Sequence, residues 1–180
     1  MREKTILFAL VGLLLVFAPR ASAHRLDEYL QATRLSLSAN QIGVEIDLTP
    51  GVDVAQAIFA MINTDHDGRI SPSEGERYAN QMVRETALEI DGRRAQLDVL
   101  RYDYPSFQEM SAGEGTIRIY ARAIWRGSAG AHRLVYQNNH KADLSVYLVN
   151  ALRPGTPAIE ITEQHRDPFQ RGMNLGFLLR

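Results

Sequence analysis

Residues 63–74 place oxygen-bearing groups at fixed offsets around a glycine. Hard divalent cations prefer oxygen ligands, and a twelve-residue calcium loop takes them from its first, third, fifth, seventh, ninth and twelfth positions. Those positions are Asn63, Asp65, Asp67, the Arg69 carbonyl, Ser71 and Glu74. We therefore predict that these residues bind Ca²⁺, with both carboxylate oxygens of Glu74 on the ion.

Three other residues of the same stretch fit this interpretation. Gly68 is at the sixth position, where the backbone must bend sharply and a side chain is disfavoured. Ile70 is at the eighth position, where an apolar side chain turns inward. His66 is at a position that supplies no ligand, and we expect it to face solvent.

Helical patterns lie on both sides of the loop. Before it, apolar residues recur at helical spacing after a predicted N-cap at Asp53, namely Val54, Ala57, Ile58, Met61 and Ile62. After it, Ser71 and Glu74 form a capping box with Pro72 at the first helical position. The helical period then continues through Ala79, Met82, Val83, Thr86 and Ala87.

With its two helices, the stretch resembles an EF-hand, and the alternative is an acidic surface turn between helices. The resemblance implies a calcium-binding protein. EF-hands usually occur in pairs, and only one such loop is found in this sequence. With three carboxylates in the site, we expect affinity in the range of extracellular modules, roughly 0.1 to 1 mM, and a structural or regulatory role for the ion.

The first 23 residues have the pattern of an export signal. Arg2 and Lys4 precede an apolar run over residues 5–18, and small residues at 21–23 form a cleavage site. This run is shorter than the roughly 20 residues that span a bilayer, although an uncleaved anchor is the alternative. We expect a mature chain that begins at His24, has no membrane span, and is periplasmic or secreted.

Composition narrows the class of protein further. The chain has 180 residues, no cysteine and a formal net charge of −1, with both signs mixed along its length. A nucleic-acid partner is not expected, because such binders present a basic face. Residues 24–180 are enough for one core, so we predict a single domain that carries the EF-hand as an insertion at about 53–88.

Outside this insertion the sequence has a two-residue period. Strict alternation over residues 42–48 predicts a strand that forms a hairpin with residues 35–37, and Asp91-Gly92 predicts a second hairpin that returns through Leu97 and Val99. Further alternation lies near residues 117–123, 134–136, 144–148, 159–161 and 175–179. We predict eight or nine strands in an antiparallel β-sandwich or barrel, a mainly β fold with inserted helices.

Three short segments carry a second resemblance. Residues 24–29 (HRLDEY), 144–152 (LSVYLVNAL) and 166–168 (RDP) resemble the extracytoplasmic module of the hydrogenase/urease accessory permeases, the HupE/UreJ family. That family is linked with nickel or cobalt transport through a membrane domain that this chain lacks. The resemblance implies a free-standing exported domain that assists or regulates a membrane permease.

An alternative function follows from this resemblance and from His24. After cleavage, the α-amino group and imidazole of His24 would chelate Ni, Co or Cu together with a second imidazole. The candidates for that second ligand are His132, His140 and His165, which otherwise are ordinary surface or core histidines.

The sequence contains no convincing pattern of catalytic residues. Asp143, His140 and Ser145 could form a hydrolytic triad, but Ser145 is not in a Gly-x-Ser-x-Gly turn, so we expect no enzyme. Tyr102, Tyr104 and Phe107 could line a groove, although packing is the more common role of aromatic residues in strands. The oligomeric state is left open by the sequence.

Overall fold

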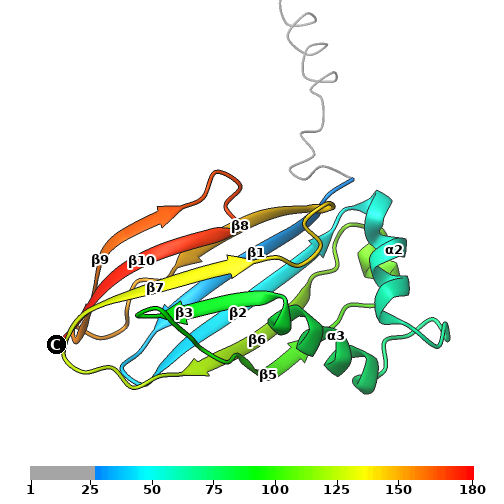
Figure 1. Cartoon of the computed structure of the whole chain (residues 1–180). Coiled ribbons are helices and arrows are strands. Elements are labelled where there is room, and N and C mark those ends of the chain that lie inside the picture. The colour runs from blue at the N-terminus through cyan, green and yellow to red at the C-terminus, as the bar shows by residue number, and fades with distance from the viewer. Residues whose placement is uncertain (1–26) are drawn as a thin grey trace, which may run out of the picture.

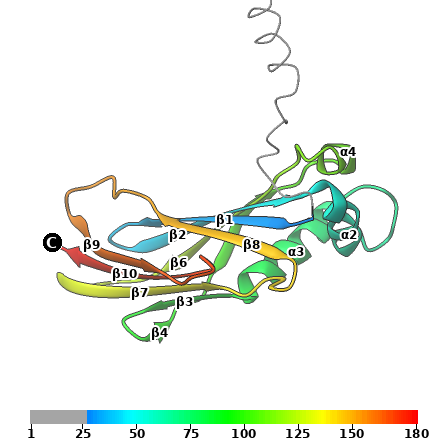
Figure 2. The same cartoon turned by 90° about the horizontal axis from the view of Figure 1, so that it is seen from above.

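The structure is a computed structural model, and it describes residues 27–180. The predicted leader and His24 lie outside these residues. The chain forms two five-stranded sheets, with strand orders β5-β6-β2-β1-β8 and β4-β3-β7-β10-β9. Figure 2 shows the sheets as two layers, and Figure 1 shows that helices α2 and α3 lie at the end of the layers opposite the C-terminus. The mainly β prediction is confirmed.

The first sheet contains β1 (Tyr29–Leu37), β2 (Gln41–Pro50), β5 (Asp98–Asp103), β6 (Ile117–Ile124) and β8 (Ser145–Ala151). The second contains β3 (Thr86–Ile90), β4 (Arg93–Arg94), β7 (Gly130–Asn138), β9 (Ile159–Arg166) and β10 (Gly172–Leu179). The helices are α2 (Val52–Ile62), α3 (Pro72–Arg84) and α4 (Phe107–Ser111).

The core follows from the two-residue period. Every second residue of β2 is buried, because successive side chains of a strand point to opposite faces of the sheet. The buried set of β2 consists of Ile42, Val44, Ile46, Leu48 and Pro50. Its members other than Pro50 belong to one core cluster with Leu134 and Tyr136 of β7 and with Leu175 and Phe177 of β10, so the two sheets share a core.

The predicted hairpin of β1 and β2 is confirmed, with Leu35 opposite Val44. The hairpin predicted at Asp91-Gly92 also forms, because β3 pairs antiparallel with β4 across this turn. Its predicted return through Leu97 and Val99 is wrong, because β4 has only two residues and the chain then crosses to the first sheet, where β5 pairs with β6. Strand β8 pairs parallel to β1, so the first sheet is mixed and not purely antiparallel, because the chain passes through the second sheet before it returns.

The predicted helix boundaries and faces also need correction. Helix α2 has Gly51 as its N-cap, and Asp53 lies in the first turn. Its buried face consists of Ala55, Ile58, Phe59 and Ile62, because α4 covers the side of Phe59, while Ala57 and Met61 are exposed. Helix α3 ends at Arg84, so Thr86 and Ala87 already belong to β3.

Helix α4 lies between β5 and β6 and was not predicted from the sequence. Its N-cap Ser106 accepts a hydrogen bond from the backbone N–H of Glu109, and the Glu109 side chain accepts from the backbone N–H of Ser106. The Ser-x-x-Glu spacing was visible in the sequence and is the same capping box that begins α3.

Candidate cation-binding loop

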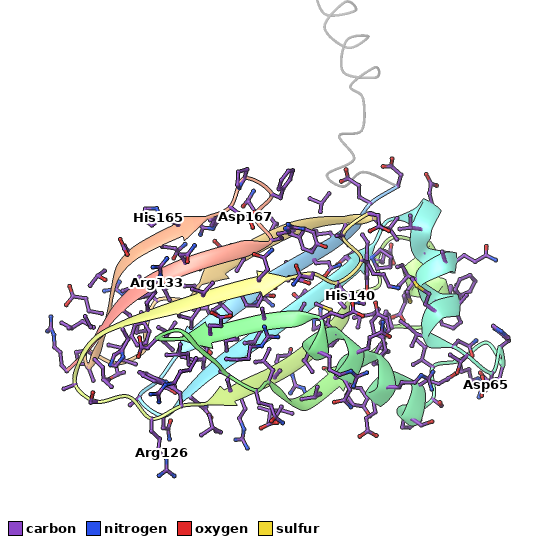
Figure 3. The ribbon with its side chains drawn as sticks, in the orientation of Figure 1. Asp65, Arg126, Arg133, His140, His165 and Asp167 are labelled. Atoms are coloured by element: carbon purple, nitrogen blue, oxygen red, sulfur yellow. The ribbon has the colours of Figure 1, made fainter. Side chains whose placement is uncertain are left out.

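The predicted ligand loop connects α2 to α3 and projects from the helical end of the molecule. Figure 3 shows Asp65 at its tip, remote from both sheets. Asn63 is the C-cap of α2, and its backbone N–H donates to the Phe59 carbonyl. The side chain of Asn63 is buried, and its Oδ1 atom has no hydrogen-bond donor within residues 27–180.

Asp65 and Asp67 shape the exposed part of the loop. The Oδ1 atom of Asp65 accepts from the backbone N–H of Asp67 at 3.2 Å, and Oδ1 of Asp67 accepts from the N–H of Arg69 at 2.8 Å. Each bond closes a short turn of the kind that Asp side chains favour. The backbone therefore curls around both carboxylates, each of which has a second oxygen.

The central bend requires a glycine for its conformation and not for lack of space. Gly68 has φ +85°, and a Cβ atom added there would meet no heavy atom within 4 Å. A side chain at such a φ is strained because Cβ approaches the following carbonyl oxygen. His66 also has a positive φ, 60°, and is exposed, as predicted.

Glu74 joins the two ends of the loop. Its Oε1 accepts from the backbone N–H of Thr64 at 2.6 Å, and its Oε2 accepts from the N–H of Ser71 at 2.9 Å and from the Ser71 hydroxyl at 2.8 Å. The pKa of Glu74 is lowered to about 2, first by the hydrogen bond from the Ser71 N–H and then by those from the Ser71 hydroxyl and the Thr64 N–H. Each of these bonds favours the ionised form of the carboxyl group. Glu74 is therefore an anion at neutral pH.

Helix α3 is held in place by two tyrosines of the β5 region. The Tyr102 hydroxyl donates to the Pro72 carbonyl at 3.0 Å, and the Tyr104 hydroxyl donates to the Gly75 carbonyl at 2.8 Å. Tyr104 also packs so closely on Gly75 that an added Cβ would lie 2.7 Å from its ring. Tyr102 and Tyr104 therefore pack on the first turn of α3, which carries Glu74, whereas Phe107 packs on Phe59 of α2.

The two helices are also tied directly to each other. One guanidinium nitrogen of Arg77 donates to the Ile62 carbonyl at 3.1 Å and to the Thr64 hydroxyl at 2.9 Å. Ile70 is partly buried and packs against the core, as its position predicted. The ends of the loop are therefore fixed, while its middle is exposed.

The loop supplies six candidate oxygen ligands of mixed type. Asn63 offers a buried amide oxygen, Arg69 a backbone carbonyl, and Ser71 a hydroxyl. The carboxylates of Asp65, Asp67 and Glu74 do not converge on one point in this structure. Residues 27–180 contain no cluster of three His, Cys, Asp or Glu side chains placed to hold a metal ion. This oxygen set nevertheless fits a hard cation, and the buried Asn63 oxygen has no hydrogen-bond partner in the part of the chain that the structure describes.

A buried polar network that was not predicted from the sequence involves Tyr78 in the middle of α3 and Glu85 at its C-cap. The Tyr78 hydroxyl bonds to Nε2 of His140 at 2.9 Å and to the Tyr29 hydroxyl at 2.9 Å. The Nδ1 atom of His140 bonds to Glu85 at 2.6 Å. Burial lowers the pKa of His140 against the opposing effect of Glu85, so the ring is neutral, donates to Glu85 and accepts from Tyr78.

The structure gives the bonding partners of His140 and His132 and the exposure of His165. Both ring nitrogens of His140 are bonded to Tyr78 and Glu85, so this ring does not join Asp143 and Ser145 in a triad. His132 bonds to Asp91 and to the Ser128 carbonyl, and the side chain of His165 is 73% exposed. The transition-metal alternative, which depends on His24, stays a prediction.

Comparisons with protein-family models, with curated proteins and with solved structures find no match for this chain. Among residues 27–180, no helix is both long and apolar enough to cross a membrane. The functional argument therefore depends on the geometry of the loop itself.

Proposed function

We propose that residues 63–74 bind Ca²⁺ in an exported β protein, and that the ion stabilises the arrangement of α2 and α3. The observation that carries the proposal is the Oδ1 atom of Asn63, a buried acceptor for which residues 27–180 provide no donor. Leaving such an atom unsatisfied costs about 1 to 3 kcal/mol. A cation at the loop centre would remove that cost, because the first position of a calcium loop is a ligand position.

The rest of the loop supports the same ligand. The turns closed by Asp65 and Asp67 curve the backbone in the way that a cation-wrapping loop requires, and Gly68 supplies the bend. Glu74 is ionised, buried and adjacent to both ends of the loop. Binding would require Glu74 to exchange its bonds with Thr64 and Ser71 for the ion, which favours modest affinity.

The structure around the loop favours a stabilising role over a switch. Tyr102 and Tyr104 fix the first turn of α3, and Arg77 links it to the end of α2. A sensor must open its helices to expose apolar surface. Here the apolar side of α2 is already covered by α4, where Phe59 and Phe107 lie 4.9 Å apart between ring centroids.

Calorimetry and thermal unfolding with CaCl₂ test the proposal. At ten times Kd, Ca²⁺ should add about 1.4 kcal/mol to the free energy of unfolding. Asp67→Asn keeps the acceptor for the Arg69 N–H but removes a charge, and it should weaken binding about tenfold or more. Asp53→Asn, the same change on exposed α2, is the matched control and should bind like wild type.

Two results would overturn the proposal. One is the absence of both binding heat and thermal shift in wild type at about 10 mM CaCl₂, well above the expected Kd. The other is an equal loss of binding in Asp53→Asn and Asp67→Asn, which would indicate a general charge effect and not a site in the loop.

A further inference from the structure

A basic pocket lies at the end of the sheets opposite the helices. It has a volume of about 460 Å³ and is bounded by the β3–β4 turn, the end of β6 and the start of β7. Figure 3 shows Arg126, one of its lining residues, at that end of the molecule, far from Asp65 of the cation-binding loop. The volume is in the range of small-molecule sites. This pocket is therefore separate from the proposed calcium site.

The lining of the pocket has an excess of positive charge. Its cationic side chains are Arg93, Arg94, Arg126 and His132, and its one acidic side chain is Asp91. Within residues 27–180, no acidic side chain forms an ion pair with any of the three arginines. Arg94 donates to the Thr86 carbonyl, which carries no charge. The whole chain has a formal net charge of −1, so this excess of cations is local.

His132 is held as a cation by its two partners. Its Nδ1 atom lies 2.8 Å from the Asp91 carboxylate, and its Nε2 atom lies 2.8 Å from the Ser128 carbonyl oxygen. Both partners are acceptors, so both ring nitrogens must donate, which only the imidazolium form can do. Asp91 is thereby engaged by His132, and the three arginines are left without a counter-charge in the lining.

The segment that carries Arg126 is fixed on both sides. Before it, the Trp125 ring is buried and is hydrogen-bonded through its indole N–H. After it, Gly127 lies so close to the Trp125 ring that an added Cβ would overlap the ring, and the Ser128 carbonyl is bonded to His132. A site with a fixed backbone loses less conformational entropy when a ligand binds.

Arg93 is directed into the same region by the β3–β4 hairpin. It pairs with Ile90 across the turn, and paired residues of an antiparallel ladder point to the same face of the sheet. Ile90 is buried in the core, so the exposed Arg93 leaves β4 on the core-facing side. Because β4 is an edge strand, this side chain lies at the gap between the two sheets, where Ile124 of β6 lines the pocket from the first sheet.

We propose that this pocket binds a doubly charged phosphate group, presented by a soluble phosphate compound or by a lipid headgroup. Guanidinium groups match phosphate oxygens with paired N–H donors. Three cations without a counter-charge favour a phosphate monoester, which carries nearly two negative charges, over a single carboxylate. Ile124, which is 55% exposed, provides apolar surface for the organic part of such a ligand.

Titration of the protein with inorganic phosphate tests the proposal. Trp125 is the only tryptophan of the chain, so its fluorescence reports on the pocket, and calorimetry measures binding independently. Wild type, without added calcium and at constant ionic strength, should bind phosphate with a Kd of about 1 mM or below. Arg93→Gln and Arg126→Gln each remove one exposed guanidinium group and should each raise Kd about fivefold. Arg153→Gln, the same change at an exposed residue outside the pocket, should leave Kd unchanged.

Two further probes distinguish the sources of the phosphate group. Retention on phosphatidylcholine vesicles that contain phosphatidic acid, but not on phosphatidylcholine alone, would identify a lipid headgroup. Glycerol phosphate that binds at least as tightly as inorganic phosphate, without retention on vesicles, would identify a soluble compound. Either result supports the proposal when Arg126→Gln weakens the binding and contradicts it when Arg126→Gln has no effect.

The proposal fails if wild type shows neither a fluorescence change nor binding heat with about 10 mM phosphate. It also fails if Arg126→Gln and Arg153→Gln weaken binding equally, because the effect would then come from the net charge of the protein and not from the pocket. Circular dichroism would confirm that each variant is folded.

Discussion

A polar cluster lies toward each end of helix α3, and the two clusters differ in whether their buried polar atoms have hydrogen-bond partners. Toward the C-terminal end, His140 is bonded to both Tyr78 and Glu85, and the Tyr78 hydroxyl is also bonded to the Tyr29 hydroxyl. At the N-terminal end, the Asn63 oxygen lacks a donor among the described residues. A satisfied network fixes a fold, whereas an unsatisfied buried acceptor is a place where a ligand can add free energy.

Two asparagines make this comparison directly testable. Asn138 is 1% exposed, and its amide donates to Gln31 while its oxygen accepts from the His140 N–H. Asn63 is 4% exposed, with its oxygen unpaired in residues 27–180. The two asparagines are therefore buried to nearly the same extent, and the main difference between them is whether the side-chain oxygen accepts a hydrogen bond.

The largest effect is expected from Asn138→Leu. The substitution leaves the Oε1 atom of Gln31 and the His140 N–H without these partners in a buried site, so it should lower the free energy of unfolding by about 3 kcal/mol. Urea denaturation without added calcium would measure the change. Asn63→Leu, the matched control, should change stability by less than about 1 kcal/mol because it removes an atom that was unsatisfied.

The same pair should respond in opposite ways to calcium. Asn138→Leu should keep the calcium-dependent stabilisation, and Asn63→Leu should lose it because the first ligand is gone. Equal losses of stability in the two variants would mean that the buried oxygen of Asn63 is no different from a satisfied one, and the comparison would fail.

A smaller effect is expected at the bend of the loop. Gly68→Ala should cost about 1 kcal/mol because alanine is strained at φ +85°, although nothing would contact its Cβ. Gly155→Ala, at an open site without a positive φ, is the control and should be neutral to within about 0.5 kcal/mol. Thermal unfolding would compare them, and equal effects would show that the bend of the loop is not strained.

Local patterns predicted the loop boundaries and the strands, because both depend on neighbouring residues. The capping box of Ser71 and Glu74 and the alternation of β2 are examples, and both are confirmed. The parallel pairing of β8 with β1 could not be predicted, because Tyr29 and Ser145 lie far apart in the sequence and only the path of the chain brings them together.

Candidate site residues were predictable in the loop, but their contacts were not. The spacing identifies Glu74 as a ligand, yet its bonds to Thr64 and Ser71 depend on the approach of α3 to the end of α2. The partners of His140 likewise come from α3 with its C-cap, β1, β7 and β8. Such contacts between distant segments leave no local pattern in the sequence. The Ser-x-x-Glu capping box of α4 is the exception, because this local pattern was present but was not used to predict the helix.

The smallest expected effect contrasts His140 of the satisfied network with His132, a histidine at the opposite end of the sheets. The bond to Asp91 raises the pKa of His132, with a further contribution from the Ser128 carbonyl, whereas burial lowers the pKa of His140. A raised pKa adds stability at low pH that is lost as pH rises above 6.5, and a lowered pKa removes stability as pH falls below 6.5.

NMR titration of the ring protons should therefore place the pKa of His132 above 6.5 and the pKa of His140 below it. His132→Gln should reduce stability more below pH 6.5 than well above it, and a loss that is independent of pH would show that His132 is not charged in the folded protein.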